Sequence, residues 1–122
     1  MEQNNSKAII LALICTVIVS VAQILLKLGS TKFSLSIDQI LNQFYNIPLL
    51  FGAGLYAIGA IVFIQAFRLG ELSVVYPVMA SGYILVTILS FYFLNETISM
   101  LDSVGLIAIT TGVLFIGVSG KK

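Results

Sequence analysis

The sequence predicts an all-α integral membrane protein in which four transmembrane helices form a single domain over residues 1–122, with a short interfacial helix between the first two spans. Of its residues, 59% are hydrophobic and 9% are charged, whereas a soluble domain carries about 25% charged residues. Four apolar stretches of about 18–22 residues are each long enough to cross the hydrocarbon layer as a helix. Their apolar residues do not alternate with polar ones, as they would in a transmembrane β-strand.

The first span, about residues 8–28, carries polar side chains on one face. They recur at intervals of four, three and four residues: Thr16, Ser20, Gln23 and Lys27. Because an amide or an ammonium group is costly in lipid, we expect this face to contact protein or water. Two roles are open for Lys27. Its side chain either extends to the membrane interface or contacts an anionic group of a substrate. A cleaved signal peptide is the alternative, but its apolar run is usually only about 7–15 residues long.

A short amphipathic helix is predicted between the first two spans, at about residues 36–46. Residues 36–39, Ser-Ile-Asp-Gln, have the pattern of a capping box. Apolar residues recur there with helical spacing: Ile37, Ile40, Leu41 and Phe44. Such a helix lies in the membrane interface, either as a structural spacer or as a gate for a substrate.

The second span, about residues 48–67, and the fourth, about residues 102–119, are rich in small residues. In the fourth span these recur along one face: Gly105, Ala108, Gly112 and Gly117. Small residues let helices approach closely in lipid, so we expect the fourth helix to pack against a second subunit. Gly70 is expected to end the second helix in the left-handed conformation. Ser99 and Asp102 predict a capping box that opens the fourth helix.

The third span, about residues 73–94, repeats the polar stripe of the first. Four polar residues at intervals of seven, four and three lie on one face of this helix: Tyr76, Tyr83, Thr87 and Ser90. Pro77 removes a backbone donor and predicts a kink, a feature that often flanks a binding site in membrane proteins. The alternative interpretation is a proline tolerated near a helix start. Tyr92 has the position of an interfacial anchor, whereas Tyr83 is too deep for that role.

The charged residues predict the orientation of the chain. Four basic residues fall on one side of the membrane and two on the other: Lys7, Arg68, Lys121 and Lys122 against Lys27 and Lys32. Because cytoplasmic loops carry the excess of basic residues, both termini are expected in the cytoplasm. All acidic residues lie in loops or at helix ends, so no carboxylate inside a span is available to couple cation export to protons.

The composition also excludes several kinds of site. With no histidine and a single cysteine, Cys15, the chain has no Ser-His-Asp triad, no internal disulfide and no Cys- or His-rich metal site. A net charge of +1 offers no basic face to nucleic acid. We therefore expect neither an enzyme nor a protein that depends on a metal or a cofactor.

Several short motifs resemble those of the drug/metabolite transporter superfamily. They occur in this order: Gln23-x-x-x-Lys27, Tyr76-Pro77, Val86-Thr87 and Glu96. Their order and spacing are similar to those of the four-helix EamA-like proteins, and especially of the subunits that flip undecaprenyl-phosphate-aminoarabinose. The small multidrug resistance proteins are a more distant likeness. Their membrane glutamate corresponds to Val19 here, so the resemblance does not imply proton-coupled export of cationic drugs.

The resemblance implies a multi-pass transporter or flippase subunit of the cell (inner or plasma) membrane. Surrounded by membrane lipid, it would move a lipid-linked or amphipathic small molecule by alternating access, in a homodimer or a heterodimer with a four-helix paralogue. The expected substrate pathway comprises Ser20, Gln23, Lys27, Tyr76, Tyr83 and Thr87, with Lys27 and Arg68 as head-group contacts. Two alternatives stay open: an exporter of small neutral or cationic metabolites or drugs, and an accessory membrane subunit without transport.

Overall fold

The computed structural model describes residues 4–31 and 45–119, in which the secondary structure is helical and no strand occurs. The helices are α1 (Asn5–Ser30), α3 (Ile47–Leu69), α4 (Leu72–Ala80), α5 (Gly82–Leu94) and α6 (Met100–Ser119). Three segments are long and apolar enough to cross a membrane, α1, α3 and the joined α4 and α5, and α6 adds a shorter apolar stretch, Met100–Ile116. The predicted all-α membrane class is therefore confirmed. The predicted interfacial helix falls almost entirely on residues 32–44, outside the described residues.

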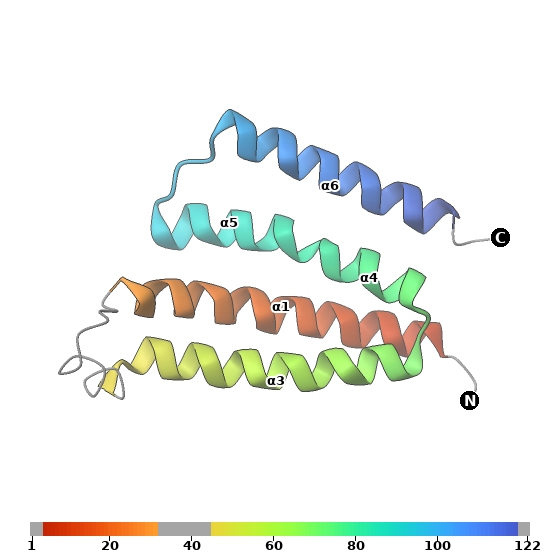
Figure 1. Ribbon diagram of the computed structural model, residues 1–122, viewed down its shortest axis with the longest axis horizontal. Helices are drawn as coiled ribbons and strands as arrows, with labels where there is room; N and C mark the ends of the chain where they lie inside the picture. Colours follow the sequence, from red (N-terminus) through yellow and green to blue (C-terminus); the bar gives the residue numbers. More distant parts are fainter. Residues whose placement is uncertain (1–3, 32–44, 120–122) are drawn as a thin grey trace.

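Helix α1 lies in the middle of the bundle (Figure 1). On one side it packs against α3, which runs antiparallel to it, and on the other side against α4 and α5 in succession. Helix α6 packs on α4, away from α1. Helix α1 begins and α6 ends at the same end of the bundle (Figure 1).

Small residues bring α1 and α3 into close contact. A Cβ atom on Gly52 would lie 2.9 Å from the backbone nitrogen of Leu26 and 3.1 Å from the carbonyl oxygen of Ala22. Further along the seam, the Cys15 thiol donates to the carbonyl oxygen of Gly59 over 3.2 Å. Since lipid provides no hydrophobic drive between helices, close backbone contact of this kind holds the pair together.

Substitution of Gly52 by alanine is expected to destabilise the protein by about 1–3 kcal/mol, because the backbone of α1 cannot move away from the added methyl group. Thermal unfolding in detergent, followed by the reaction of the buried Cys15 thiol with a fluorogenic maleimide, measures the loss. Gly54→Ala is the matched control on the same helix, since its Cβ atom would have no described atom within 4 Å. Equal stability of the two variants would show that the α1–α3 seam is not tightly packed.

Gly70 does not adopt the predicted left-handed conformation. It ends α3 with φ −132° and ψ 165°, which is extended backbone. A glycine is needed there for space instead, because a Cβ atom would collide with the side chain of Ala8 and lie 3.2 Å from Val75 Cγ2. The prediction was wrong because this contact joins distant parts of the chain. The residue that adopts the left-handed conformation is Asn95, with φ 52°, at the end of α5.

The third predicted span is divided into two helices. Helix α4 ends and α5 begins at Ser81, one turn beyond the buried Pro77. The N–H group of Ser81 donates to the carbonyl oxygen of Val78 over 3.2 Å, and the Ser81 hydroxyl donates to the same oxygen. This tighter turn replaces the regular α-helical bond, so the helix is interrupted at Ser81 while Pro77 stays inside α4.

The capping box predicted at the start of the last helix is confirmed. The backbone N–H of Ser99 donates to Asp102 Oδ2 over 2.9 Å, and the N–H of Asp102 donates to Ser99 Oγ over 3.2 Å. Beyond this cap, α6 is mostly exposed. Cβ atoms on Gly105 and Gly112 would have no described atom within 4 Å, so this small-residue face of α6 is uncovered within the described chain.

Candidate functional site

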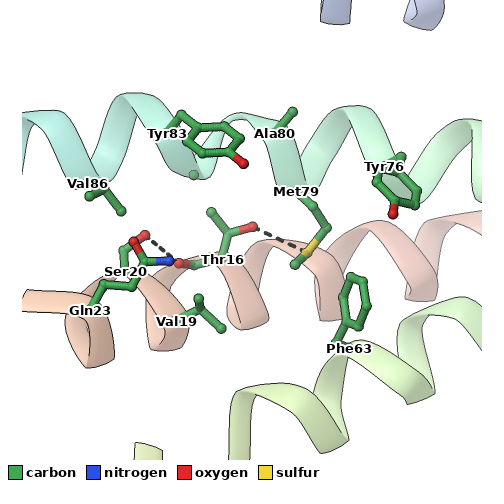
Figure 2. A pocket seen from close by; sticks show the side chains of 11 residues that line it. Thr16, Val19, Ser20, Gln23, Phe63, Tyr76, Met79, Ala80, Tyr83 and Val86 are labelled. Atoms are coloured by element: carbon green, nitrogen blue, oxygen red, sulfur yellow. Dashed lines mark hydrogen bonds between the residues drawn. The ribbon is translucent and has the colours of Figure 1, made fainter. Parts of the chain in front are cut away.

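A cavity of about 250 Å³, here called the central cavity, lies between α1 and the helices on both of its sides (Figure 2). Its lining comes from the first three predicted spans: Thr16, Val19, Ser20, Gln23, Phe63, Tyr76, Met79, Ala80, Gly82, Tyr83 and Val86. The polar stripes of the first and third spans therefore face each other across one space. Of the predicted pathway residues, Ser20, Gln23, Tyr76 and Tyr83 meet there.

The hydroxyl groups of α1 in this cavity are bonded to their own helix. Thr16 Oγ1 donates to the carbonyl oxygen of Ala12 over 2.8 Å, and Ser20 Oγ donates to that of Thr16 over 2.7 Å. Both residues are buried, so these bonds offset the cost of removing the hydroxyls from water. With their protons engaged, the two oxygens face the cavity as acceptors.

Gln23, Tyr76 and Tyr83 provide the other polar groups of the central cavity. None of the three side chains forms a hydrogen bond with a residue in the described ranges 4–31 and 45–119, and all three are exposed. Their amide and phenol groups both donate and accept. The central cavity therefore offers polar groups of both kinds to a bound molecule.

Gly82 allows α5 to approach α1 at the floor of the central cavity. A Cβ atom on Gly82 would lie 2.9 Å from Thr16 Cγ2. Any side chain at this position would project toward α1 and occupy the space between the two polar stripes. The central cavity therefore stays open only because residue 82 is a glycine.

A second cavity, of about 440 Å³ and here called the lateral cavity, lies between α5 and α6. It shares Tyr83 and Val86 with the central cavity. Its two charged residues, Glu96 and Asp102, lie at the loop between the two helices, with the apolar Ile98 and Leu101 beside them. The lining is Tyr83, Val86, Thr87, Ser90, Phe91, Glu96, Thr97, Ile98, Leu101, Asp102, Gly105, Leu106 and Ile109. Thr87, predicted to line the substrate pathway, lies here, where its hydroxyl donates to the Tyr83 carbonyl oxygen over 2.8 Å.

Lys27 forms an ion pair at the polar end of the lateral cavity. Its Nζ atom lies 3.2 Å from Glu96 Oε1, and the other carboxylate oxygen accepts a hydrogen bond from Ser90. The two charged side chains are 56% and 47% exposed, so other molecules can reach the pair. The hydrogen bond from Ser90 and, after it, the Lys27 ammonium group hold the pKa of Glu96 below its usual value.

This shift gives stability a defined pH dependence. Because the folded pKa of Glu96 is lowered, its contribution is complete above the unfolded pKa and is lost as the pH falls through the folded pKa. The difference in Tm between the wild type and Glu96→Gln should be constant near neutral pH and shrink below about pH 4.3, the ordinary glutamate pKa. A difference that persists unchanged to pH 3 would exclude the ion pair as its cause.

Lys27 and Arg68, the two predicted head-group contacts, lie at opposite ends of the bundle. Lys27 is in the last turn of α1, and Arg68 is in the last turn of α3, which runs the other way (Figure 1). One head group at one membrane face can therefore contact one of these cations but not both. Lys27 and Arg68 are therefore two separate candidate positions for a head group, one at each end of the bundle.

Sequence reasoning did not assign Glu96, Phe63 or Met79 to the site. The position of Glu96 was accessible from topology, since the first and third spans run in the same direction and both Lys27 and Glu96 follow at their ends. Phe63 and Met79 look like ordinary lipid-facing or core residues in sequence. Thr16 lies 3.6 Å from Met79 Sδ, a contact between α1 and α4 that no local pattern signals (Figure 2).

Three known proteins are similar to most of this chain. One is the "Probable 4-amino-4-deoxy-L-arabinose-phosphoundecaprenol flippase subunit ArnF" of Shewanella sediminis, 29% identical over 90% of this chain and 87% of its own length. The "Uncharacterized protein y4nH" of Sinorhizobium fredii is 28% identical over 95% of this chain and 99% of its own length. The "Probable magnesium transporter NIPA9" of Arabidopsis thaliana is 25% identical over 95% of this chain, which spans only 35% of that protein.

No family model and no solved structure matches the chain. The distant similarity to a flippase subunit and to a transporter confirms the resemblance to small drug/metabolite transporter-like membrane proteins. Within residues 4–31 and 45–119, no three His, Cys, Asp or Glu side chains gather to form a metal site.

Proposed function

We propose that this protein is a subunit of a membrane transporter that moves an amphipathic, lipid-linked phosphate compound between the leaflets of the cell's inner or plasma membrane, without converting it chemically. The observation that carries the proposal is the pair of cavities that meet at Tyr83 and Val86. Each combines mostly apolar walls with a few polar groups, and together they extend from the middle of the bundle to Glu96 beyond the end of α5. The flippase and transporter names of two relatives support a transport role.

The lateral cavity suits an amphiphile better than a fully polar solute. Ser90, Glu96 and Asp102 lie at its loop end, whereas Leu106 and Ile109 lie farther along α6. A head group at the loop end would meet charges and hydroxyls, and a hydrocarbon tail could extend between α5 and α6 toward the lipid. Binding sites of transporters commonly combine such apolar walls with a few placed polar groups.

The working unit in this proposal is a dimer, either of two copies or of this chain with a four-helix paralogue. The small-residue face of α6 that contains Ala108 and Gly112 would pair the subunits, while Gly105, nearer the start of the helix, lines the lateral cavity. The first three spans would line the central cavity. Alternating access would then present the substrate first to the cation at one end, Lys27 or Arg68, and then to that at the other. Both termini would lie in the cytoplasm, as the basic residues favour.

Reconstitution tests this proposal directly. In vesicles, the flipping of a polyprenyl phosphate sugar that carries a nitrobenzoxadiazole label is followed by dithionite quenching of the outer leaflet. Tyr83→Phe, which removes a hydroxyl from both cavities, is expected to slow flipping about tenfold, the effect of one lost hydrogen bond in a low-dielectric site. Tyr92→Phe is the matched control, since Tyr92 is 74% exposed and lines neither cavity.

Other outcomes would contradict parts of the proposal. Wild-type flipping in a Lys27→Ala, Arg68→Ala double variant would exclude head-group contact by these cations. An absence of flipping together with Mg²⁺ flux into the same vesicles would replace lipid movement by ion transport. Resistance to toxic cations on expression in cells would favour an exporter of small cationic compounds.

A further inference from the structure

We propose that the Lys27–Glu96 ion pair is a gate that closes the substrate pathway at the Lys27 end of the bundle. The pair has to open before a molecule can enter or leave the two cavities at this end. The proposal rests on the proposed function, because it describes how access to that pathway is controlled. It gives Glu96 a role in gating, whichever molecule the protein transports.

The ion pair lies directly beyond the last residues of the central cavity. Gln23 and Val86 lie at one end of the row of side chains that line this cavity (Figure 2). One helical turn farther on, four residues after each of them, come Lys27 on α1 and Ser90 on α5. Lys27 Nζ lies 3.2 Å from Glu96 Oε1, and Ser90 donates a hydrogen bond to the other carboxylate oxygen. These contacts join α1 to α5 where the cavity ends.

The same contacts lie across the face of α5 that the two cavities share. Tyr83 and Val86 line both cavities, and Ser90 continues this face, seven and four residues after them. Ser90 and Glu96 also line the lateral cavity. A molecule that follows this face toward the end of the bundle therefore reaches the ion pair. While the pair is formed, its two side chains block the way out.

The ion pair is weak enough to open and close during transport. Its charged side chains are 56% and 47% exposed, so water screens the attraction between them. An exposed pair of this kind changes an equilibrium by about two- to fivefold. Helix α5 contains no buried residue, so moving it away from α1 takes no side chain out of the buried core.

Modification of a cysteine at position 86 measures the gate without any substrate. The full chain with Val86→Cys is placed in lipid nanodiscs and reacted with two water-soluble thiosulfonates of similar size, one cationic and one anionic. Mass spectrometry gives the two rates. Glu96→Gln and Lys27→Gln should each raise both rates about two- to fivefold, the contribution of one exposed ion pair. Cys15 is buried, so a second modification of the chain shows that a variant has unfolded.

Reversal of the charges shows whether the two residues act as a pair. Lys27→Glu places two carboxylates together and should raise both rates beyond those of Glu96→Gln, because like charges repel. The combined variant Lys27→Glu, Glu96→Lys restores opposite charges and should return both rates to near the wild-type value. It also provides the test if a single variant does not fold.

Matched controls separate the ion pair from the other charges of the chain. Glu71→Gln removes an exposed carboxylate at the opposite end of the bundle. Lys32→Gln and Asp38→Asn change the other charges that follow α1 in the sequence. None of these variants should raise both rates, and an effect equal to that of Glu96→Gln would overturn the gate. A cysteine introduced by Ile88→Cys, on α5 but in the lining of neither cavity, should react at a rate that no variant changes.

The outcomes separate this gate from the proposed function. A rise in both rates that the combined variant reverses supports the gate. Opposite changes for the two reagents, rates that no variant changes, or a combined variant as reactive as the single ones would each overturn the gate and leave lipid transport standing. If the reconstituted wild type flips no lipid while the cysteine reacts as expected, the gate stands and the proposed substrate is wrong.

Discussion

Replacing Gly82 by leucine is expected to stop flipping while leaving the helices folded. A Cβ atom at this position would already lie 2.9 Å from Thr16 Cγ2, and the rest of a leucine side chain would fill much of the central cavity between the two polar stripes. Overpacking typically lowers folding stability by about 1–3 kcal/mol, a factor of about 5–150 in the folding equilibrium. In the protein that stays folded, the leucine side chain also blocks the path of the substrate, so flipping is lost. The flipping assay in vesicles measures the effect.

Gly54→Leu is the control for this substitution. It introduces the same side chain at a helical glycine that has open space beside it, so flipping should remain near the wild-type rate. The reaction of Cys15 with maleimide during heating shows whether both variants are folded. A folded Gly82→Leu protein that flips lipid at the wild-type rate would mean that the central cavity is not on the substrate path.

The second large effect is expected from Gly112→Leu on α6. If two subunits pair through the uncovered small-residue face of this helix, a leucine at its centre holds the two backbones apart. We expect association to weaken at least about tenfold, since close contact through small residues provides most of the attraction between helices in lipid. Energy transfer between labelled subunits, measured while the protein is diluted in lipid, gives the association constant.

Gly54→Leu again provides the comparison, now as a leucine on the exposed side of α3. If it weakens association and Gly112→Leu does not, α3 and not α6 carries the subunit contact. If Gly112→Leu dissociates the subunits and flipping continues unchanged, a single chain is the transport unit. Loss of association and of flipping together is the result expected from the proposed dimer.

The fold class and the facing of the polar stripes were accessible from sequence because both depend on local periodicity. A residue three or four positions along a helix lies on the same face whatever surrounds it, so Ser20 and Gln23 could be placed together, and so could Tyr76 and Tyr83. Two such stripes in neighbouring spans must avoid lipid, which makes a shared cavity the simplest arrangement.

Features that depend on contacts between distant segments could not be predicted in the same way. The sequence around Gly70 has the pattern of a left-handed helix cap, but Gly70 is extended and packs closely against Ala8. The glycines of α3 and α6 look alike in sequence, yet Gly52 contacts α1 closely whereas Gly112 has open space beside it. The helix is interrupted at Ser81 because its N–H group donates to the carbonyl oxygen of Val78. The presence of Pro77 in the sequence does not specify this hydrogen bond.

The two parts of the third span, on either side of Ser81, differ in how deeply they are buried. Val75 of α4 is fully buried and belongs to the core formed with Ala8, Ala12 and Ala66, whereas α5 contains no buried residue. Helix α5 also has a chamber on each side, since Tyr83 and Val86 line both cavities. Helix α5 therefore separates the two cavities while it packs against α1. A displacement of α5 toward α1 would narrow the central cavity and widen the lateral cavity, so the space available to a molecule in one cavity depends on what the other contains.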